Sequence, residues 1–399
     1  MNLKKVKIVA LGILLSFILY LYVYLSSYIT QTDKKIKELE EQNEKKLDKN
    51  KHRGILQEWM KKNLSHHDQM KGIFYLKVNK AASNTLQIMF NKYADKHNQI
   101  VGMPCSNNGD ERHLVGWPEP FEPEHLIPLR KDLFRYWEHL NEHVKYSSKI
   151  KQVMAPGSVF VASIREPFSH FYSYFNFYSM ENTYRKYLKP PNKFKYFLDN
   201  VKTMPHLELI HHMPPSNPIA ECFGIRRALQ YNITVIEEKI NEIEKEFDIV
   251  MVVEYLEESL ILLTELSDLT IEDVVILKSN NVRNLNKSKP ILTPNEYENL
   301  IQWNLADSMI YNHFNKTLWE KINKFGRHNM ASKMEELNEA KSLQKNNNEE
   351  DLGKRKHEQK MQNIYYADNY FRRKMTLNGV YDLKKANRTC RYPPGRYGQ

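Results

Sequence analysis

Residues 72–86 read GIFYLKVNKAASNTL and combine an apolar run with a stretch of small and polar residues. The apolar run at residues 73–76 predicts a buried strand, and the small residues that follow predict a loop that leads into a helix. Backbone N–H groups in such a loop, with the positive end of the following helix, can form an anion site to which Lys80 adds a full charge. The alternative is an ordinary strand-to-helix turn, because a single K-x-x-S-x-T match is weak.

Apolar residues recur after the loop at helical spacing. They are Leu86, Met89, Phe90, Tyr93 and Ala94. This periodicity predicts a helix that packs on the sheet with one face. The strand-loop-helix order is the context that a phosphate loop requires. The loop is not of the Walker A type, because the glycines of G-x-x-x-x-G-K-[ST] are missing.

A second strand and helix are predicted from residue 158 onward. Residues 158–164 form a near-continuous apolar run, which is typical of a buried parallel strand, and Pro167 suits the first position of a helix. Arg165 therefore lies just past the carboxyl end of a strand, where open α/β sheets bind ligands. Ser169 and Ser173, four residues apart, share one face of the helix.

Two more strands are predicted, at residues 247–253 and 273–277, with a helix at 255–266 between them. Strands that alternate with helices indicate an α/β fold with a parallel sheet and right-handed crossovers. Residues 103–128 are rich in Pro, Gly and Asn and predict a long loop. Residues 130–151 are charged and aromatic and predict a helix.

The predicted catalytic domain covers residues 66–330, and residues 331–399 form a charged C-terminal extension. Residues 294–324 predict a helix near the end of the domain. Residues 331–362 lack proline and predict either a long exposed helix or a disordered insertion.

Composition limits the partners of this chain of 399 residues. Its formal net charge of +11 suits nucleic acid, a membrane surface or a small anion. Zinc-finger spacing, an aromatic RNP pattern and isolated basic blocks are missing, which favours the small anion over nucleic acid. Cys105, Cys222 and Cys390 show no C-x-x-C spacing, so a zinc site is not expected. In an oxidising compartment they allow one disulfide, whose pair the sequence leaves open.

The N-terminal part predicts a membrane anchor. Residues 1–7 form a short tail with three lysines, and residues 8–29 are uncharged and mostly apolar over a length that can cross a bilayer. The run is longer than the apolar region of a cleaved signal peptide. We therefore expect an uncleaved signal anchor of type II topology, followed by a charged stem at residues 30–65.

Four motifs together resemble the Golgi galactose 3-O-sulfotransferase family, whose members use 3′-phosphoadenosine 5′-phosphosulfate (PAPS). KVNKAASNTL at residues 77–86 is similar to K-T-H-K-T-[AG]-S-S-T-[LV], and IREP at 164–167 is similar to L-R-D-P. Residues 254–263 resemble E-x-x-x-E-S-L-x-L-L. Residues 304–319 resemble N-x-x-D-x-x-x-Y-x-x-F-N-x-T-x-W. The likeness runs, in patches, from about residue 73 to residue 325.

The resemblance implies a P-loop-like sulfotransferase fold, a central parallel sheet flanked by helices and preceded by a single transmembrane helix. It implies PAPS as co-substrate, no metal, and transfer to the 3-hydroxyl of galactose in a glycolipid or glycoprotein glycan. The implied donor-binding residues are Lys77, Lys80, Ala82, Ser83, Asn84, Thr85, Arg165, Ser173 and Arg283. The first loop would hold the 5′-phosphosulfate, with Lys80 as a catalytic group, whereas Arg165 and Ser173 would hold the 3′-phosphate.

The chain departs from the family pattern inside the loop. Asn79 replaces a family histidine and Ala81 replaces a threonine, so the general base has to be sought elsewhere. A histidine on a charged helix is more often solvated than catalytic, but the resemblance implies His143 as the base because it matches another family histidine. The next candidates are His97, His113 and His139.

Two other functions are compatible with the sequence. A type II membrane glycan-binding protein with a decayed donor site is suggested by Asn79 and Ala81. A lumenal nucleotide-dependent kinase is disfavoured because no Walker A loop or Asp-based magnesium motif is evident. The expected location is the Golgi membrane with the catalytic body in the lumen. No nucleic-acid partner is expected, and oligomeric state is left open.

Overall fold

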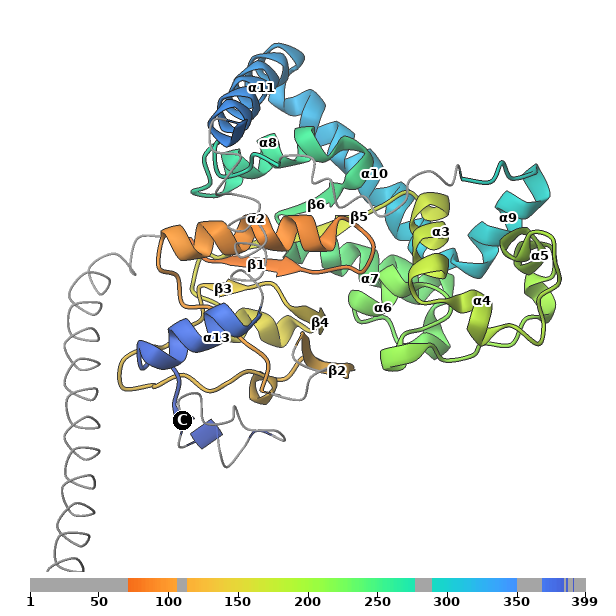
Figure 1. The fold of residues 1–399 in the computed structure, drawn as a ribbon, viewed down its shortest axis with the longest axis horizontal. Helices are drawn as coiled ribbons and strands as arrows, with labels where there is room; N and C mark the ends of the chain where they lie inside the picture. Colours follow the sequence, from red (N-terminus) through yellow and green to blue (C-terminus); the bar gives the residue numbers. More distant parts are fainter. Residues whose placement is uncertain are drawn as a thin grey trace, which may run out of the picture. The chain divides into compact units, whose positions relative to one another are not determined.

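The computed structural model describes residues 71–105, 113–276, 289–349, 368–383, 385–386 and 390. Their central feature is a four-stranded parallel sheet in the order β3-β1-β5-β6 (Figure 1). Its strands are β1 (Ile73–Leu76), β3 (His139–Leu140), β5 (Val159–Ile164) and β6 (Ile249–Val252). A second, two-stranded parallel sheet joins β2 (Leu114–Pro120) to β4 (His143–Lys145). The predicted α/β class with a central parallel sheet is confirmed.

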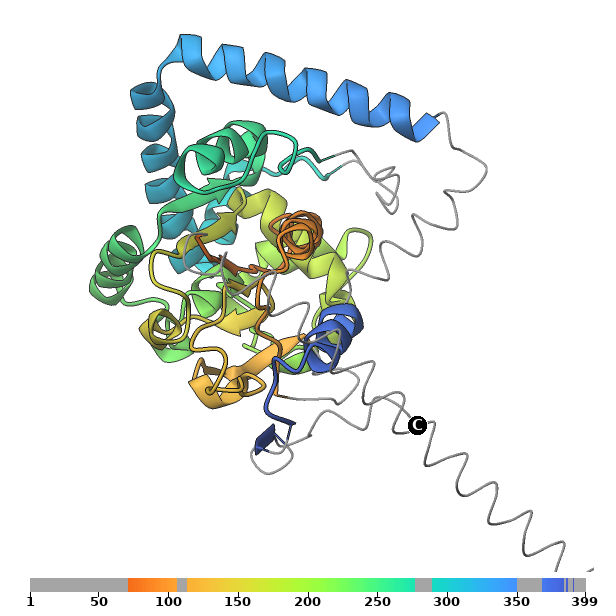
Figure 2. The same cartoon turned by 90° about the vertical axis from the view of Figure 1, so that its left-hand side faces the viewer.

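Helices cover both faces of the central sheet. Figure 2 shows α2 on one side of it and α7 and α10 on the other. The longer helices of the body are α2 (Ser83–Lys96), α3 (Pro167–Phe177), α7 (Ile233–Glu246), α8 (Leu256–Leu266), α9 (Pro294–Trp303) and α10 (Leu305–Phe325). The shorter ones are α4 (Met180–Thr183), α5 (Lys193–Asp199) and α6 (Pro218–Cys222).

The core sits on the two faces of β1, which is buried at every residue. Strand side chains alternate between faces, so Tyr75 and Phe74 point to opposite sides. The Tyr75 ring packs on Phe90 of α2, with ring centroids 5.0 Å apart. Phe74 packs on Phe160 of β5 and on Phe247, which precedes β6, at 5.1 Å and 6.1 Å. These contacts hold the loop after β1 between a rigid strand and a rigid helix.

The strand register brings the carboxyl ends of the central strands to one edge of the sheet. Leu76 of β1 pairs with Ala162 of β5, and Ile164 of β5 pairs with Val252 of β6. The loop after β1 and Arg165 after β5 therefore leave the sheet on the same side. This edge is where ligands of open α/β sheets bind.

The helix predicted at residues 130–151 is wrong. That segment contains β3, β4 and a 3-10 turn at Ser148–Gln152. Backbone groups near β3 bond to distant strands and loops instead of to their own helix. Glu138 O accepts from Ile73 N at 2.7 Å, and His139 O accepts from Gly102 N at 2.7 Å. Sheet bonds between distant segments thus replace the local helical ones.

Two neighbouring predictions also need correction. Residues 103–128 are not one long loop, because they contain β2, whose residue Val115 pairs with Val144 of β4. Residues 273–276 form a turn and coil instead of a strand, and residue 277 lies outside the described residues. The Asp273 carboxylate accepts hydrogen bonds from the N–H and hydroxyl of Thr270, which closes the turn.

The helix predicted at 294–324 is two helices. α9 ends and α10 begins at Asn304, whose φ of −115° and ψ of 49° are not helical. Gly326, with a φ of 97°, ends α10, and α11 (Arg327–Glu349) then runs in a different direction (Figure 2). The long-helix alternative is confirmed for residues 331–349, whereas residues 350–362 lie outside the described part.

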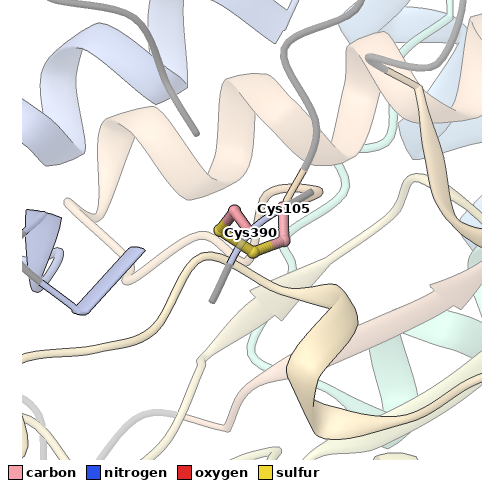
Figure 3. The surroundings of a disulfide bond; sticks show 2 residues. All are labelled: Cys105 and Cys390. Carbon is pink, nitrogen blue, oxygen red and sulfur yellow. A yellow bond between two sulfur atoms is a disulfide. The ribbon is translucent and has the colours of Figure 1, made fainter. Parts of the chain in front are cut away.

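Residues near the C-terminus pack on the sheet edge. α13 (Asp368–Leu377) contacts α2 through Tyr370 and Lys374, which both donate to the Asp95 carboxylate. A disulfide joins Cys105 to Cys390 (Figure 3). This is the pair that the sequence left open, and Cys222 is a buried free thiol.

The predicted membrane anchor is not described by the structure. The tail at residues 1–7, the anchor at 8–29 and the stem at 30–65 all lie outside the described residues. Among the helices that are described, none is both long enough and apolar enough to span a bilayer.

Candidate functional site

The loop between β1 and α2 has a backbone shape that favours anion binding. Lys80 and Ala82 have φ angles of 64° and 59°, in the left-handed region that non-glycine residues rarely adopt. Alternation of such residues with ordinary ones turns successive N–H groups toward one point. Ala82 is the N-cap of α2 and gives no side-chain cap, and no acidic residue occupies the first turn. The start of α2 therefore keeps its positive end for a ligand.

Side chains from three neighbouring elements hold the carbonyl oxygens of this loop. The pairs are His143 Nδ1 to Lys77 O (2.9 Å), His170 Nε2 to Asn79 O (2.8 Å), Arg165 Nη1 to Lys80 O (3.4 Å) and Ser163 Oγ to Ala81 O (2.7 Å). With the carbonyls held against β4, α3 and β5, the N–H groups face the other way. None of the described residues offers a hydrogen-bond acceptor to the N–H of Lys80 or of residues 82–85. Together these groups form a cradle for an anion.

Two cations stand beside this cradle. The Lys80 ammonium lies 4.1 Å from the centre of the Phe177 ring, and none of the described carboxylates pairs with it. Burial, and then the neighbouring Arg165 guanidinium, lowers the pKa of Lys80. Apart from its bond to Lys80 O, Arg165 has a long contact with a carboxylate, 4.0 Å from its Nε to Glu254 Oε1. An anion between these cations would relieve their mutual repulsion.

His143 is placed to act as a base at this loop. Its Nδ1 donates to Lys77 O, because a carbonyl oxygen can only accept, so the lone pair is on Nε2. Burial, and then the Lys77 ammonium, lowers the pKa of His143 well below its usual value. The imidazole is therefore neutral at pH 7, and its Nε2 can accept a proton.

The other histidines are less well placed. His97 follows the last residue of α2, at the end of that helix opposite to the loop. His139 is fully buried in the sheet, and burial lowers its pKa to about 3. His113 is exposed and lies next to His143, with its Nδ1 3.6 Å from the Glu142 carboxylate. Of the three, His113 alone is near the loop.

Lys77 is directed away from the cradle. Its side chain is 3% exposed, and the ammonium donates to Gln87 Oε1 of α2 at 2.7 Å. Gln87 Nε2 in turn donates to Glu142 Oε1 at 2.9 Å. This chain of contacts joins the loop, α2 and the segment that carries His143. Contact between Lys77 and a donor stays a prediction.

The residues predicted to bind the 3′-phosphate, Arg165 and Ser173, lie just before α3 and within it. The Glu166 carboxylate caps that helix by accepting from Phe168 N and Ser169 N at 2.9 and 2.7 Å. The helix end is thus already satisfied, so an anion here would depend on side chains. Arg165 stands just before this cap, and Ser173 is partly exposed in the middle of α3. Donor contact by Ser173 stays a prediction.

The structure gathers most of the predicted residues at one loop. They are Lys80, Ala82, Ser83, Asn84, Thr85, Arg165 and His143. Ser173 follows on α3, and Arg283 lies outside the described residues. In the described part of the chain, no cluster of three His, Cys, Asp or Glu side chains is arranged to hold a metal.

Three residues of this region were not predicted from the sequence as site residues. Ser163 is a polar residue inside an apolar strand, and that contrast was a usable signal. His170 lies in an aromatic stripe that reads as core, so its bond to Asn79 O depends on the fold alone. Lys289 donates to the Ser169 hydroxyl at 2.6 Å, across 120 residues of sequence.

The fold and site define an α/β protein whose loop at the carboxyl edge of a parallel sheet has the backbone shape and nearby cations that suit an anion. Residues 2–389 match the model of the galactose-3-O-sulfotransferase family, and the chain belongs to this family. The family that the sequence motifs predicted is thereby confirmed.

Curated relatives share about a quarter of their aligned residues with the chain. It is 28% identical to mouse galactosylceramide sulfotransferase over 273 residues, 68% of this chain and 62% of the relative. It is 24% identical to bovine galactose-3-O-sulfotransferase 3 over 280 residues, 67% of this chain and 62% of the relative. It is 27% identical to human galactose-3-O-sulfotransferase 2 over 255 residues, 63% of this chain and 61% of the relative. The matched part thus spans less than two thirds of each relative's length.

Proposed function

We propose that this protein is a carbohydrate sulfotransferase that moves a sulfuryl group from PAPS to a galactose hydroxyl, the 3-hydroxyl by analogy with its family. The observation that carries the proposal is the cradle of N–H groups at Lys80 and residues 82–85, with Lys80 and Arg165 beside it. Uncompensated N–H groups and cations fit the phosphosulfate of this donor.

Each residue of the site has a separate role in sulfuryl transfer. The bond between the galactose oxygen and sulfur forms while the bond between sulfur and the bridging phosphate oxygen breaks. Lys80 and the loop N–H groups stabilise the charge that grows on the departing phosphate. His143 Nε2 takes the proton of the attacking hydroxyl. Arg165 and Ser173 orient the donor through its 3′-phosphate.

His143 replaces the histidine that is missing from the loop. Asn79, the residue at that loop position, instead anchors the loop through its carbonyl and contacts the Met213 sulfur. His143 approaches the same loop from β4 through Lys77 O. A proton acceptor at the loop therefore does not depend on residue 79.

We also propose that residues 8–29 anchor the protein in the Golgi membrane with the body in the lumen. Support comes from the apolar run and from the Cys105–Cys390 disulfide, because disulfides persist in oxidising compartments. Protease protection of the body in intact Golgi vesicles tests this topology. Digestion without detergent would contradict it.

One assay tests the activity. The full chain, in detergent, is incubated with sulfur-labelled PAPS and β-galactosides in the presence of EDTA. Label in the sugar supports the proposal, and glycosidic mapping of the product identifies the hydroxyl. Binding of 3′,5′-ADP without transfer would indicate a decayed site. Metal-dependent phosphate transfer from ATP would indicate a kinase.

A further inference from the structure

A cavity of about 330 Å³ lies outside the anion cradle and has no role in the mechanism above. Its walls come from the segment before α6 and from the turn before α7, and they include His206, Pro214, Ser216, Arg227, Ala228 and Tyr231. The volume is at the lower end of the roughly 300–1,000 Å³ that small-molecule sites occupy. We call it the side cavity.

The side cavity begins next to the loop that carries Lys80. Met213 Sδ lies 4.0 Å from Asn79 Nδ2, and the next residue, Pro214, is part of the cavity wall. Pro214 O also accepts from the Tyr174 hydroxyl of α3 at 2.9 Å. Since consecutive Cα atoms are about 3.8 Å apart, the wall starts one residue from a contact with the loop.

The inner wall presents neutral hydrogen-bonding groups and an aromatic ring. Ser216 Oγ lies 3.2 Å from Tyr231 Oη and 3.5 Å from His206 Nδ1. His206 stacks on Trp303 with ring centroids 4.3 Å apart. Burial lowers the pKa of His206, so the ring is neutral at pH 7. The hydroxyl oxygens keep further acceptor capacity for a ligand hydroxyl, beside the apolar Pro214 and Ala228 of the same wall.

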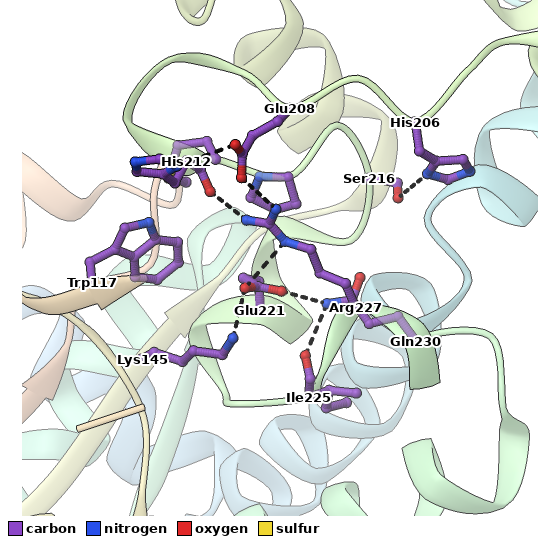
Figure 4. Close-up of polar contacts among 12 residues, drawn as sticks. Trp117, Lys145, His206, Glu208, His212, Ser216, Glu221, Ile225, Arg227 and Gln230 are labelled. Atoms are coloured by element: carbon purple, nitrogen blue, oxygen red, sulfur yellow. Dashed lines mark hydrogen bonds and ion pairs between the residues drawn. The ribbon is translucent and has the colours of Figure 1, made fainter. Parts of the chain in front are cut away.

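The two charged residues of the cavity wall, Arg227 and Glu208, pair with each other. Figure 4 shows the Arg227 guanidinium between the carboxylates of Glu208 and Glu221, at 2.9 and 3.4 Å. Glu221 is buried and also binds Lys145 and Gln230, at 2.8 and 2.9 Å. Because its cation has two carboxylate partners, the cavity is not arranged to select an anion. It therefore differs in charge from the cradle at Lys80.

We infer that the side cavity binds an uncharged sugar unit, the one adjacent to the reacting galactose in a glycan acceptor. The identity of the reacting sugar rests on the proposed function. The neutral hydroxyl-binding wall, the stacked ring and the position beside the loop together favour this ligand over a second phosphate or a lipid chain. The protein then prefers a disaccharide that ends in galactose over a simple galactoside.

The test blocks the cavity at its exposed wall. Ala228 is exposed, so Ala228→Trp adds bulk at the cavity without disturbing the core. Ala331→Trp, at an exposed position of α11, is the matched control. A second variant, Ser216→Ala, removes one hydroxyl from the wall. The full chain is titrated with N-acetyllactosamine and with methyl β-galactoside, both in the presence of 3′,5′-ADP, and binding is followed by saturation-transfer NMR. Transfer from PAPS is measured in parallel.

The wild-type protein and Ala331→Trp should bind N-acetyllactosamine more tightly than methyl β-galactoside. Ala228→Trp should remove that difference, and Ser216→Ala should weaken disaccharide binding by roughly three- to tenfold, the loss of about one hydrogen bond. Binding by the simple galactoside should not change. If Ala228→Trp binds the disaccharide as tightly as the wild type, the inference is overturned, whatever the transfer result. If the wild-type protein transfers no sulfuryl group but binds the disaccharide, and Ala228→Trp weakens that binding, the proposed function is overturned and the inferred sugar site stands.

Discussion

Lys80 combines an unusual backbone conformation with an exposed aromatic contact. Its positive φ turns the loop. Its ammonium lies over the Phe177 ring, and none of the described carboxylates forms an ion pair with it. Cation–π contacts of this kind are weak at exposed positions, about 0.5–1 kcal/mol. The ammonium can therefore leave Phe177 for an anion at little cost.

Replacement of Lys80 by Ala should reduce turnover about 100- to 1,000-fold, because one preorganised donor to a developing charge is worth that much. The KM for the donor should rise less, since the loop N–H groups remain. Initial rates with labelled PAPS measure both constants. Lys316→Ala, at an exposed site of α10, serves as the control. Turnover close to the wild type would remove Lys80 from the mechanism.

The pH dependence of kcat/KM should show two limits, which report groups of the free enzyme. His143 is a base only when neutral, so activity falls as pH drops through its lowered pKa, well below the usual 6.5. Lys80 acts only when protonated, and its lowered pKa moves the alkaline fall to below 10.5. The profile should therefore be flat around pH 7.

Two variants test whether His143 causes the acid limit of the pH profile and Lys80 the alkaline limit. Lys80→Arg keeps its charge at high pH and should lose the alkaline fall in its residual activity. His143→Gln should lose about 100- to 10,000-fold in kcat and show no acid limb. An unchanged acid limb in His143→Gln would redirect the search to His113, which lies beside it.

At the scale of elements, α3 depends on its acidic cap. Glu166 accepts from two N–H groups at the start of the helix, directly after Arg165. The same residue joins α3 to the segment after β6, because Glu166 N donates to Glu254 Oε2 at 3.1 Å. The cap therefore fixes the point from which Arg165 extends.

Glu166→Ala should lower the free energy of unfolding by about 0.5–2 kcal/mol, the usual cost of a lost helix cap. Thermal or urea unfolding followed by circular dichroism measures the change. Glu320→Ala removes a carboxylate from the exposed face of α10 and should leave stability nearly unchanged. Equal effects of the two substitutions would show that the cap contributes little.

The elements that sequence could predict are those whose pattern is local. β1, β5 and β6 are continuous apolar runs, and α2 and α8 show helical periodicity. β3 and β4 are two and three residues long, and they are strands because they pair with β1 and β2 from distant parts of the chain. No local pattern carries that information. The helix predicted over them was wrong for this reason.

The site divides in the same way. Lys80 and Arg165 were predictable, because Lys80 lies in the loop after β1 and Arg165 directly follows β5, and both strands are apolar runs in the sequence. The bonds that orient the loop, from Ser163 and His170, were not, because they depend on how β5 and α3 stand against it. Family likeness supplied His143, which composition alone would have left as a surface residue. The tautomer of His143 follows from the contact between its Nδ1 and Lys77 O, which only the structure shows.

At the scale of the whole molecule, the C-terminal segment completes the body. Tyr381 donates to Val101 O at 2.7 Å, and Cys390 is bonded to Cys105. Arg130 N and Asp382 N add backbone bonds between this segment and residues 128–130. The catalytic-domain boundary near residue 330 stays a prediction, but contacts from beyond it support the sheet edge.

Loss of the disulfide should destabilise the protein by about 2–4 kcal/mol, because it cross-links residues 285 positions apart. Cys105→Ser/Cys390→Ser should melt at a lower temperature than the wild type under oxidising conditions. A reducing agent should lower the wild-type melting temperature to that of the variant and leave the variant unchanged. Identical melting curves with and without reductant would contradict a stabilising role.

The same disulfide sets an order of events during synthesis. Cys105 leaves the ribosome 285 residues before Cys390, roughly 15 to 60 s earlier at ordinary elongation rates. Cys222 emerges in between, and pairing with it would trap the chain. Burial raises the pKa of Cys222 to about 12, and only a thiolate attacks, so the folded surroundings of α6 protect against this mispairing. Burial of Cys222 before Cys390 emerges would therefore favour the Cys105–Cys390 pair.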